Sequence, residues 1–145
     1  MRKSPLLTFR YIVEIDGIVT AGFSEVSGLD QEIETEEFHE GGVDFIHHLP
    51  KGIKNSNLVL KRGISDSNEL RNWYNDVVKA ISFGSKIPKS SNISILILNA
   101  VGEDEVRFHI KSAYPVKWSG PRLSGSGSEV AIETLELVHE GLVIV

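Results

Sequence analysis

TFRYIVEIDG, at residues 8–17, is the stretch that decides the fold, because its side chains alternate along an extended chain. A period of two residues predicts a half-buried strand. The Asp16-Gly17 dipeptide favours the positive φ angles of a two-residue turn. We therefore expect a β-hairpin whose second strand is formed by residues 18–23. The first strand has Phe9, Tyr11, Val13 and Ile15 on one face and Thr8, Arg10, Ile12 and Glu14 on the other.

Further segments show strand patterns of different kinds. Residues 31–38 place glutamates on one face, so this strand cannot be fully buried without a large desolvation cost. Residues 92–99 are apolar on both faces, which is typical of a central strand covered on both sides. Three more strands are expected: residues 57–63, residues 106–111, which form a second hairpin with 92–99, and residues 129–139.

The last of these strands changes its apolar phase. Val130 and Ile132 are in one phase, whereas Leu135 and Leu137 are in the other, so the alternation slips near Glu133. A slip of this kind indicates a β-bulge or a strand that passes from one sheet to another.

Two stretches lack a regular period and are predicted to be loops. The first, residues 41–57, contains Pro50 and Gly52, and loops of this length in compact domains are more often functional than idle. The second, residues 114–127, contains Pro115 and ends in a run of alternating serine and glycine.

One helix is predicted, over residues 66–83. Asp66 is suited to the N-cap, and Glu69 three residues later completes a capping-box pattern. Gly84 and Pro88 end the helix. Its apolar side chains form one stripe that we expect to face the core: Leu70, Trp73, Tyr74, Val77, Val78 and Ile81.

About seven strands and one helix define the expected fold class. It is mainly β, an antiparallel barrel or sandwich with the single helix against its side or mouth. A chain of 145 residues is a common size for one domain, and no linker or internal repeat divides it. We therefore expect a single domain over residues 1–145.

Composition narrows the function classes. The net charge is -5 and the basic residues are not clustered, which argues against nucleic acid as a partner of the surface. The absence of cysteine excludes disulfides and thiolate metal sites. No apolar run is long enough for a membrane helix, and the N-terminus lacks the apolar core of a signal peptide.

The sequence offers little catalytic chemistry, and we expect neither an enzyme nor a cofactor or metal site. His47-His48 would point to opposite faces of a strand, and no third ligand is suitably spaced. The glutamates near residue 34 form a row of like charges, which is more typical of a solvated face than of a catalytic pair. Trp118, in a predicted loop, is the one tryptophan that the helix core does not explain.

Five segments together resemble the phage-type tail-tube family, and their order and spacing match across nearly the whole chain. They are FRYIVEIDG at 9–17, AGFSEVSGL at 21–29, LVLKRGI at 58–64, YPVKWSGP at 114–121 and EVAIETLELVHEGL at 129–142. The resemblance implies a structural subunit that forms six-membered rings. Stacked rings would make a hollow inner tube inside a contractile sheath, with DNA or an effector protein passing through the channel.

The resemblance also implies partners, surfaces and a location. The partners would be further copies of the chain, sheath subunits and baseplate or tube-initiator proteins. The chain would be assembled in the bacterial cytoplasm and end in a phage tail or an injection particle. Residues expected at subunit interfaces are Glu40, Gly41, Gly42, His48, Leu49, Pro50, Lys51 and Trp118. Two alternative faces are expected to line the channel: Glu32, Glu34 and Glu36, or Arg107, His109 and Lys111.

Three other functions remain open at this point. A tube-initiator paralogue that links the tube to the baseplate would share the same motifs. A monomeric β-barrel that binds a small ligand would need a pocket inside the barrel. A hydrolase would use the acidic strand.

Overall fold

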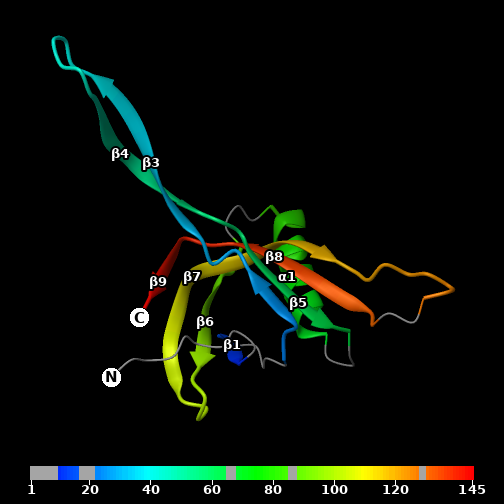
Figure 1. Cartoon of the computed structure of the whole chain (residues 1–145). Coiled ribbons are helices and arrows are strands. Elements are labelled where there is room, and N and C mark those ends of the chain that lie inside the picture. The colour runs from blue at the N-terminus through cyan, green and yellow to red at the C-terminus, as the bar shows by residue number, and fades with distance from the viewer. Residues whose placement is uncertain (1–9, 17–21, 65–67, 85–87, 128–129) are drawn as a thin grey trace.

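A computed structural model describes residues 10–16, 22–64, 68–84, 88–127 and 130–145 (Figure 1). These residues form nine strands and one helix, which confirms the mainly β class. The elements are β1 (Tyr11–Ile15), β2 (Glu25–Ser27), β3 (Gln31–His39), β4 (Ile46–Asn55), β5 (Leu58–Gly63), α1 (Glu69–Ser82), β6 (Ser91–Leu98), β7 (Asp104–Ser119), β8 (Ile132–Val138) and β9 (Gly141–Ile144).

The body of the molecule is built from antiparallel strands in the order β1-β6-β7-β8-β5-β2, and β9 also pairs with β7. The first half of β7 lies between β6 and β9. Together with β1, these strands form sheet A. The second half of β7 pairs with β8. Together with β5 and β2, these strands form sheet B. In the described residues β1 and β2 do not pair with each other. The two sheets therefore form a sandwich that shares β7 and is open at these two edge strands.

Strand β7 passes from one sheet to the other at two irregular positions. Ser112 has a φ of 52°, which is unusual for a residue with a side chain. The register with β8 then shifts between Pro115 and Lys117. The prediction of a loop over residues 114–127 is therefore wrong for its first part, because Pro115 is accommodated at a bulge and the strand continues to Ser119.

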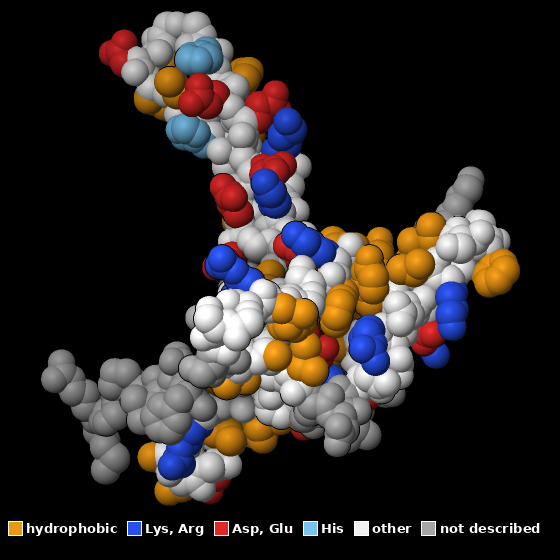
Figure 2. Space-filling model, turned by 90° about the vertical axis from the view of Figure 1, so that its right-hand side faces the viewer, with side chains coloured by type: hydrophobic (Ala, Val, Ile, Leu, Met, Phe, Trp, Pro, Cys, Tyr) orange, Lys and Arg blue, Asp and Glu red, His pale blue; other side chains and the backbone are white. Residues whose placement is uncertain are grey.

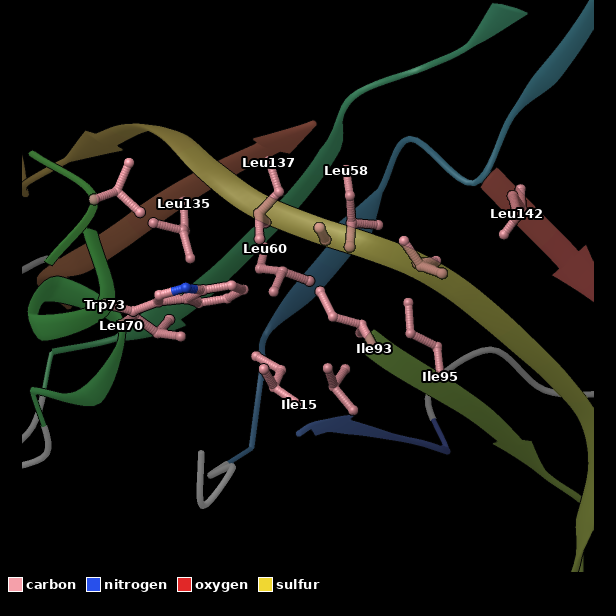
Figure 3. Packing of buried hydrophobic residues seen from close by; sticks show 14 residues of the cluster. Ile15, Leu58, Leu60, Leu70, Trp73, Ile93, Ile95, Leu135, Leu137 and Leu142 are labelled. Carbon is pink, nitrogen blue, oxygen red and sulfur yellow. The ribbon is translucent and has the colours of Figure 1, made fainter. Parts of the chain in front are cut away.

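The core lies between the two sheets and the helix (Figure 3). Leu58, Leu60, Leu135 and Leu137 from sheet B meet Ile93 from sheet A, and all are almost completely buried. Strand β6 also buries Leu96 on its opposite face, as expected for a central strand. The predicted pairing of this strand with residues 106–111 is confirmed.

Helix α1 is confirmed, although its start differs from the prediction. It begins at Glu69 after Asn68, whose side chain makes no capping hydrogen bond, and the expected N-cap Asp66 lies outside the described residues. Of the predicted stripe, Leu70, Trp73 and Val77 are buried. Tyr74 is partly buried, whereas Val78 and Ile81 are exposed, so the buried stripe is narrower than the sequence pattern suggested.

The first predicted hairpin is not found among the described residues. Strand β1 pairs with β6, and residues 17–21 of the expected turn and return strand lie outside the described part of the chain. The described Gly22 and Phe23 are not in a strand. The Tyr11 hydroxyl instead donates to the Phe23 carbonyl at 2.8 Å, and burial together with the Glu25 carboxylate raises the pKa of this tyrosine.

The largest correction concerns residues 41–57. They were expected to be a loop, but β4 pairs with β3 over nearly its full length and forms a hairpin, the arm, that extends away from the body in Figure 1. Burial cannot impose a period of two residues on a strand that is exposed on both faces, so the sequence pattern gave no sign of it.

Candidate functional site

The arm, residues 31–55, is the most unusual surface of the molecule. All nine residues of β3 are exposed, and β4 is exposed over most of its length. Contacts with the body are found at the root, where the Gln31 side chain donates to the Leu142 carbonyl at 3.4 Å. A two-stranded ribbon on its own is marginally stable in water, so an arm of this length calls for a partner surface.

Figure 2 shows charged and histidine side chains along the arm with hydrophobic side chains between them. The cross-strand register sorts these residues into two faces. One face carries Glu32 opposite Lys54, Glu34 opposite Gly52, Glu36 opposite Leu49 and Phe38 opposite His47. The other carries Ile33 opposite Ile53, Thr35 opposite Pro50, Glu37 opposite His48 and His39 opposite Ile46.

A β-bulge interrupts the arm near its middle. The register shifts between Glu34 and Thr35, whose partners are Gly52 and Pro50, so that Lys51 is the extra residue. Pro50 cannot donate to a strand ladder, and a bulge in an exposed strand is a position that tolerates it.

The tip of the arm is held by contacts around His47. Its Nε2 lies 3.2 Å from the Glu40 carboxylate, and its ring lies edge-on to Phe45 with centroids 4.8 Å apart. Gly42 follows in the turn with a φ of 86°, a conformation that favours glycine. The structure thus brings the expected interface residues 40–42 and 48–51 together on one element.

The root of the arm depends on Gly28, which precedes β3. Its φ is 91°, and a Cβ atom at this position would lie 1.9 Å from the Asn57 carbonyl oxygen. Asn57 lies between β4 and β5, so the two chain segments that enter and leave the arm are in close backbone contact here.

A buried ion-pair network lies on the inner side of sheet B, and sequence reasoning missed it. Arg62 Nε donates to Glu133 at 2.7 Å, and its Nη2 donates to Glu69 of α1 at 3.0 Å. Burial lowers the pKa of Arg62, but its hydrogen bonds to the two carboxylates outweigh this effect and raise the pKa above the ordinary value. A charged residue in the buried phase of each of two neighbouring strands was the signal that could have revealed the pair.

Trp118 belongs to the same network. It was expected in a loop, but it lies in a strand. It lies in β7, is packed against the core and donates from Nε1 to Glu133 at 3.4 Å. Its position is therefore explained by packing, and the expected interface role stays a prediction.

The second charged face lies on sheet A. Arg107 and Lys111 of β7 are exposed, and His109 between them is partly exposed, with its Nδ1 3.3 Å from the Ser94 hydroxyl. This face and the face of the arm that carries Glu32, Glu34 and Glu36 are the two alternatives for a channel wall, and they lie on different elements.

Metal and ligand sites find little support in the described part of the chain. His47 and His48 fall on opposite faces of the arm, and no group of three or more potential ligands is found among the described residues. A surface pocket of about 270 Å³ is lined by residues that include Ser90, Ser112, Tyr114 and His139. It lies outside the core, whereas a ligand-binding barrel would need a pocket between the sheets.

Comparison with known families identifies the chain. The model of the T4-like virus tail tube protein gp19 family matches residues 7–143, nearly the full length. The chain belongs to this family. It is therefore a tube protein with a structural role, and the resemblance seen in the five sequence segments is confirmed.

Solved structures share the fold of this tail tube protein. A chain of the anti-feeding prophage tube-terminating cap is 23% identical and has a TM-score of 0.87, with 99% of this chain and 93% of that chain covered. A chain of the PVC extracellular contractile injection system, in the sheath-tube complex, is 22% identical with a TM-score of 0.84 and 97% and 90% covered. Hcp1 from Flavobacterium johnsoniae is 15% identical with a TM-score of 0.63 and 94% of each chain covered.

No curated protein matches this sequence significantly. Among the described residues no helix is long and apolar enough to cross a bilayer.

Proposed function

We propose that this tail tube protein forms six-membered rings that stack coaxially into the inner tube of a contractile, phage-tail-like particle. The family and the shared fold support this proposal. The observation that carries it is the arm, which is exposed on both faces and contacts its own body at the root. Head-to-tail contacts between copies close into a ring when the rotation between them fits, and they give such an arm a surface to bind.

The sheet edges favour the same arrangement. Strands β1 and β2 are at the two ends of the strand order, and an unpaired edge invites pairing with another chain. In a ring, edges of neighbouring copies would lie side by side. The resulting channel would admit DNA or an effector protein, and the outer surface would face sheath subunits.

Residues 40–42 and 48–51 are proposed as contacts between copies, because they lie on the half of the arm between its central bulge and its tip, away from the body of their own chain (Figure 1). The particle would be assembled in the bacterial cytoplasm from copies of this chain, a baseplate and a sheath.

The tube initiator, which would link the tube to the baseplate, is a second candidate of the same class, since the fold also occurs in a chain of the anti-feeding prophage baseplate structure. A ligand-binding monomer is less favoured, because side chains fill the space between the sheets (Figure 3). A hydrolase is less favoured as well, because the glutamates of the arm face solvent rather than a pocket.

Sedimentation of the purified chain over a range of concentrations tests the proposal. Six copies of the 16.0 kDa chain would sediment as a species of about 96 kDa or as longer stacks. A variant in which Asn-Gly joins Ile33 to Ile53, in place of residues 34–52, removes most of the arm at a matched cross-strand pair. We expect this variant to keep the circular dichroism of the body but to lose assembly.

A full-length chain that sediments at 16 kDa at every concentration would contradict the proposal. A shortened variant that assembles as well as the full-length chain would show that the arm is not the element that joins the copies.

A further inference from the structure

The arm is joined to the body by two short connections. Its first strand, β3, follows β2 after residues 28–30, and its second strand, β4, is separated from β5 by residues 56 and 57. Leu29 in the first connection packs against the core, and Leu58, the first residue of β5, is completely buried. Both connections are therefore anchored within a few residues of the arm, which leaves the arm little slack.

The two sides of the root are also bonded to each other. The Ser56 amide donates to the Asp30 carbonyl at 3.3 Å, and the Gln31 side-chain amide donates to Asn55 Oδ1 at 3.1 Å. The two strands therefore leave the body as one unit, and any swing of the arm is a movement of the whole ribbon about its root.

Each side of the ribbon is held to the body by one further hydrogen bond. At the start of β3, the Gln31 side-chain amide donates to the Leu142 carbonyl of β9 at 3.4 Å. After the end of β4, the Ser56 carbonyl accepts from His139 Nε2 at 3.0 Å. A side-chain amide has two N–H groups, so Gln31 serves Asn55 and Leu142 at once. Attachments on both sides of the ribbon oppose a rotation that one attachment would leave free.

The part of the body that holds the arm is itself fixed. His139 and Glu140 connect β8 to β9. The Glu140 amide donates to the Lys111 carbonyl of β7 at 2.9 Å, and Gly141 pairs with the same lysine. The arm is therefore held against the strand that both sheets share.

His139 is oriented by its contact with the root of the arm. A carbonyl oxygen only accepts, so the Nε2 atom that faces Ser56 carries a proton. The other ring nitrogen, Nδ1, is buried and has no hydrogen-bond partner, which costs free energy. The ring keeps this orientation despite the cost, and the bond that the orientation secures is the one to Ser56.

We propose that Gln31 and His139 form a latch that fixes the direction of the arm in a single copy of the chain. The arm is then oriented before it meets any other surface, although both of its strands are largely exposed. An element that is already oriented loses less conformational entropy when it binds. Gln31 and His139 are positioning residues, and the inference goes beyond the proposed function because it concerns one copy alone.

Distances between spin labels test the latch. The chain has no cysteine, so cysteines introduced for labelling are the only ones present. Asp44→Cys with Lys79→Cys places labels near the tip of the arm and on α1, at two exposed positions. Asp44→Cys with Glu34→Cys reports on the ribbon itself, and Lys79→Cys with Lys111→Cys reports on the body. The labelled chain is mixed with an excess of the same chain without cysteine, so that each distance lies within one copy.

The latch variant carries Gln31→Ala and His139→Leu. The nine residues of β3 span about 30 Å, so a swing of about 20° at the root moves the tip by about 10 Å. We expect a narrow arm-to-body distribution in the chain with the latch and one broader by about 10 Å in the latch variant. The distributions within the arm and within the body should be unchanged, because the strand pairing and the core are intact.

Three single variants separate the hydrogen bond from other effects of substitution. His139→Gln offers an amide that donates to the Ser56 carbonyl in place of Nε2, so this variant should keep the narrow distribution. His139→Leu lacks a donor and should broaden it. His39→Leu is the matched control, because His39 is exposed and lies on the arm beyond its root, and it should leave the arm-to-body distances unchanged.

Two results would overturn the latch. An arm-to-body distribution as broad in the unsubstituted chain as in the latch variant would mean that the arm swings freely. Equally narrow distributions in both would mean that its direction does not depend on these two side chains. In either case the proposed function stands, because it is tested by the sedimentation of the chain and not by distances within one copy.

Discussion

At the scale of single residues, Arg62 and Glu133 link the helix to sheet B. Both are almost completely buried, and Arg62 also reaches Glu69 at the start of α1. A buried charge is tolerated because each partner satisfies the other, and the loss of one leaves an unpaired charge in the core. The network therefore constrains where the helix sits on the sandwich.

Replacing one partner of this pair should be more damaging than replacing both. We expect Arg62→Met to lower the free energy of unfolding by about 3–5 kcal/mol, because Glu133 is left buried without its partner. Arg62→Met combined with Glu133→Leu should restore much of this loss. Urea unfolding measures both variants, and a double variant less stable than Arg62→Met would contradict the explanation.

Gly28 is the second residue with a specific requirement. Gly28→Ala should destabilise the protein by at least about 2 kcal/mol, because the positive φ is strained for alanine and the new methyl group meets the Asn57 carbonyl. Gly41→Ala is the matched control, since no atom lies within 4 Å of its Cβ position. Thermal unfolding measures both variants. Equal melting temperatures would show that the root of the arm is not tightly packed.

At the scale of elements, α1 separates buried from exposed positions on adjacent residues. Val77 is 5% exposed and Val78 is 42% exposed. We expect Val77→Ala to cost about 1.5–3 kcal/mol of stability and Val78→Ala about 0.5 kcal/mol or less. Equal losses in urea unfolding would mean that the helix is rotated relative to the orientation described here.

The elements also show which features a sequence can predict. The helix was predicted because burial of one side imposes a period on its side chains, and strand β6 was predicted because its residues are apolar on both faces. Strand β4 was missed because it is exposed on both faces, and the end of β7 was missed because Pro115 sits at a bulge within a strand. In these two cases the backbone pairing, which leaves no mark on hydrophobic periodicity, determines the structure.

The phase slip in the last strand had a different cause from the one predicted. Strand β8 pairs with β5 without a register shift, and Glu133 occupies a core position because Arg62 neutralises it. The prediction of a bulge or a change of sheet was therefore wrong, because the slip in the pattern comes from the buried charge of Glu133 and not from the backbone. The strand that does change sheets is β7.

At the scale of the whole molecule, the body and the arm have different relations to solvent. The body has a filled core, whereas the arm exposes apolar side chains such as Ile33, Phe45 and Ile53 at 61–66%. Membership of the tail tube family was predictable because five short segments resemble the family in the same order and spacing along the chain. The surfaces that join copies were predicted only as residue sets, because the contacts depend on the neighbouring copy.

Electron microscopy of the purified chain in negative stain tests the central claim most directly. The claim is that identical copies surround a hollow axis, with arms bridging neighbours. We predict rings with a central hole, seen end-on, and tubes of stacked rings, seen from the side. The claim would be contradicted if only separate small particles without a hole were seen, even at high protein concentration.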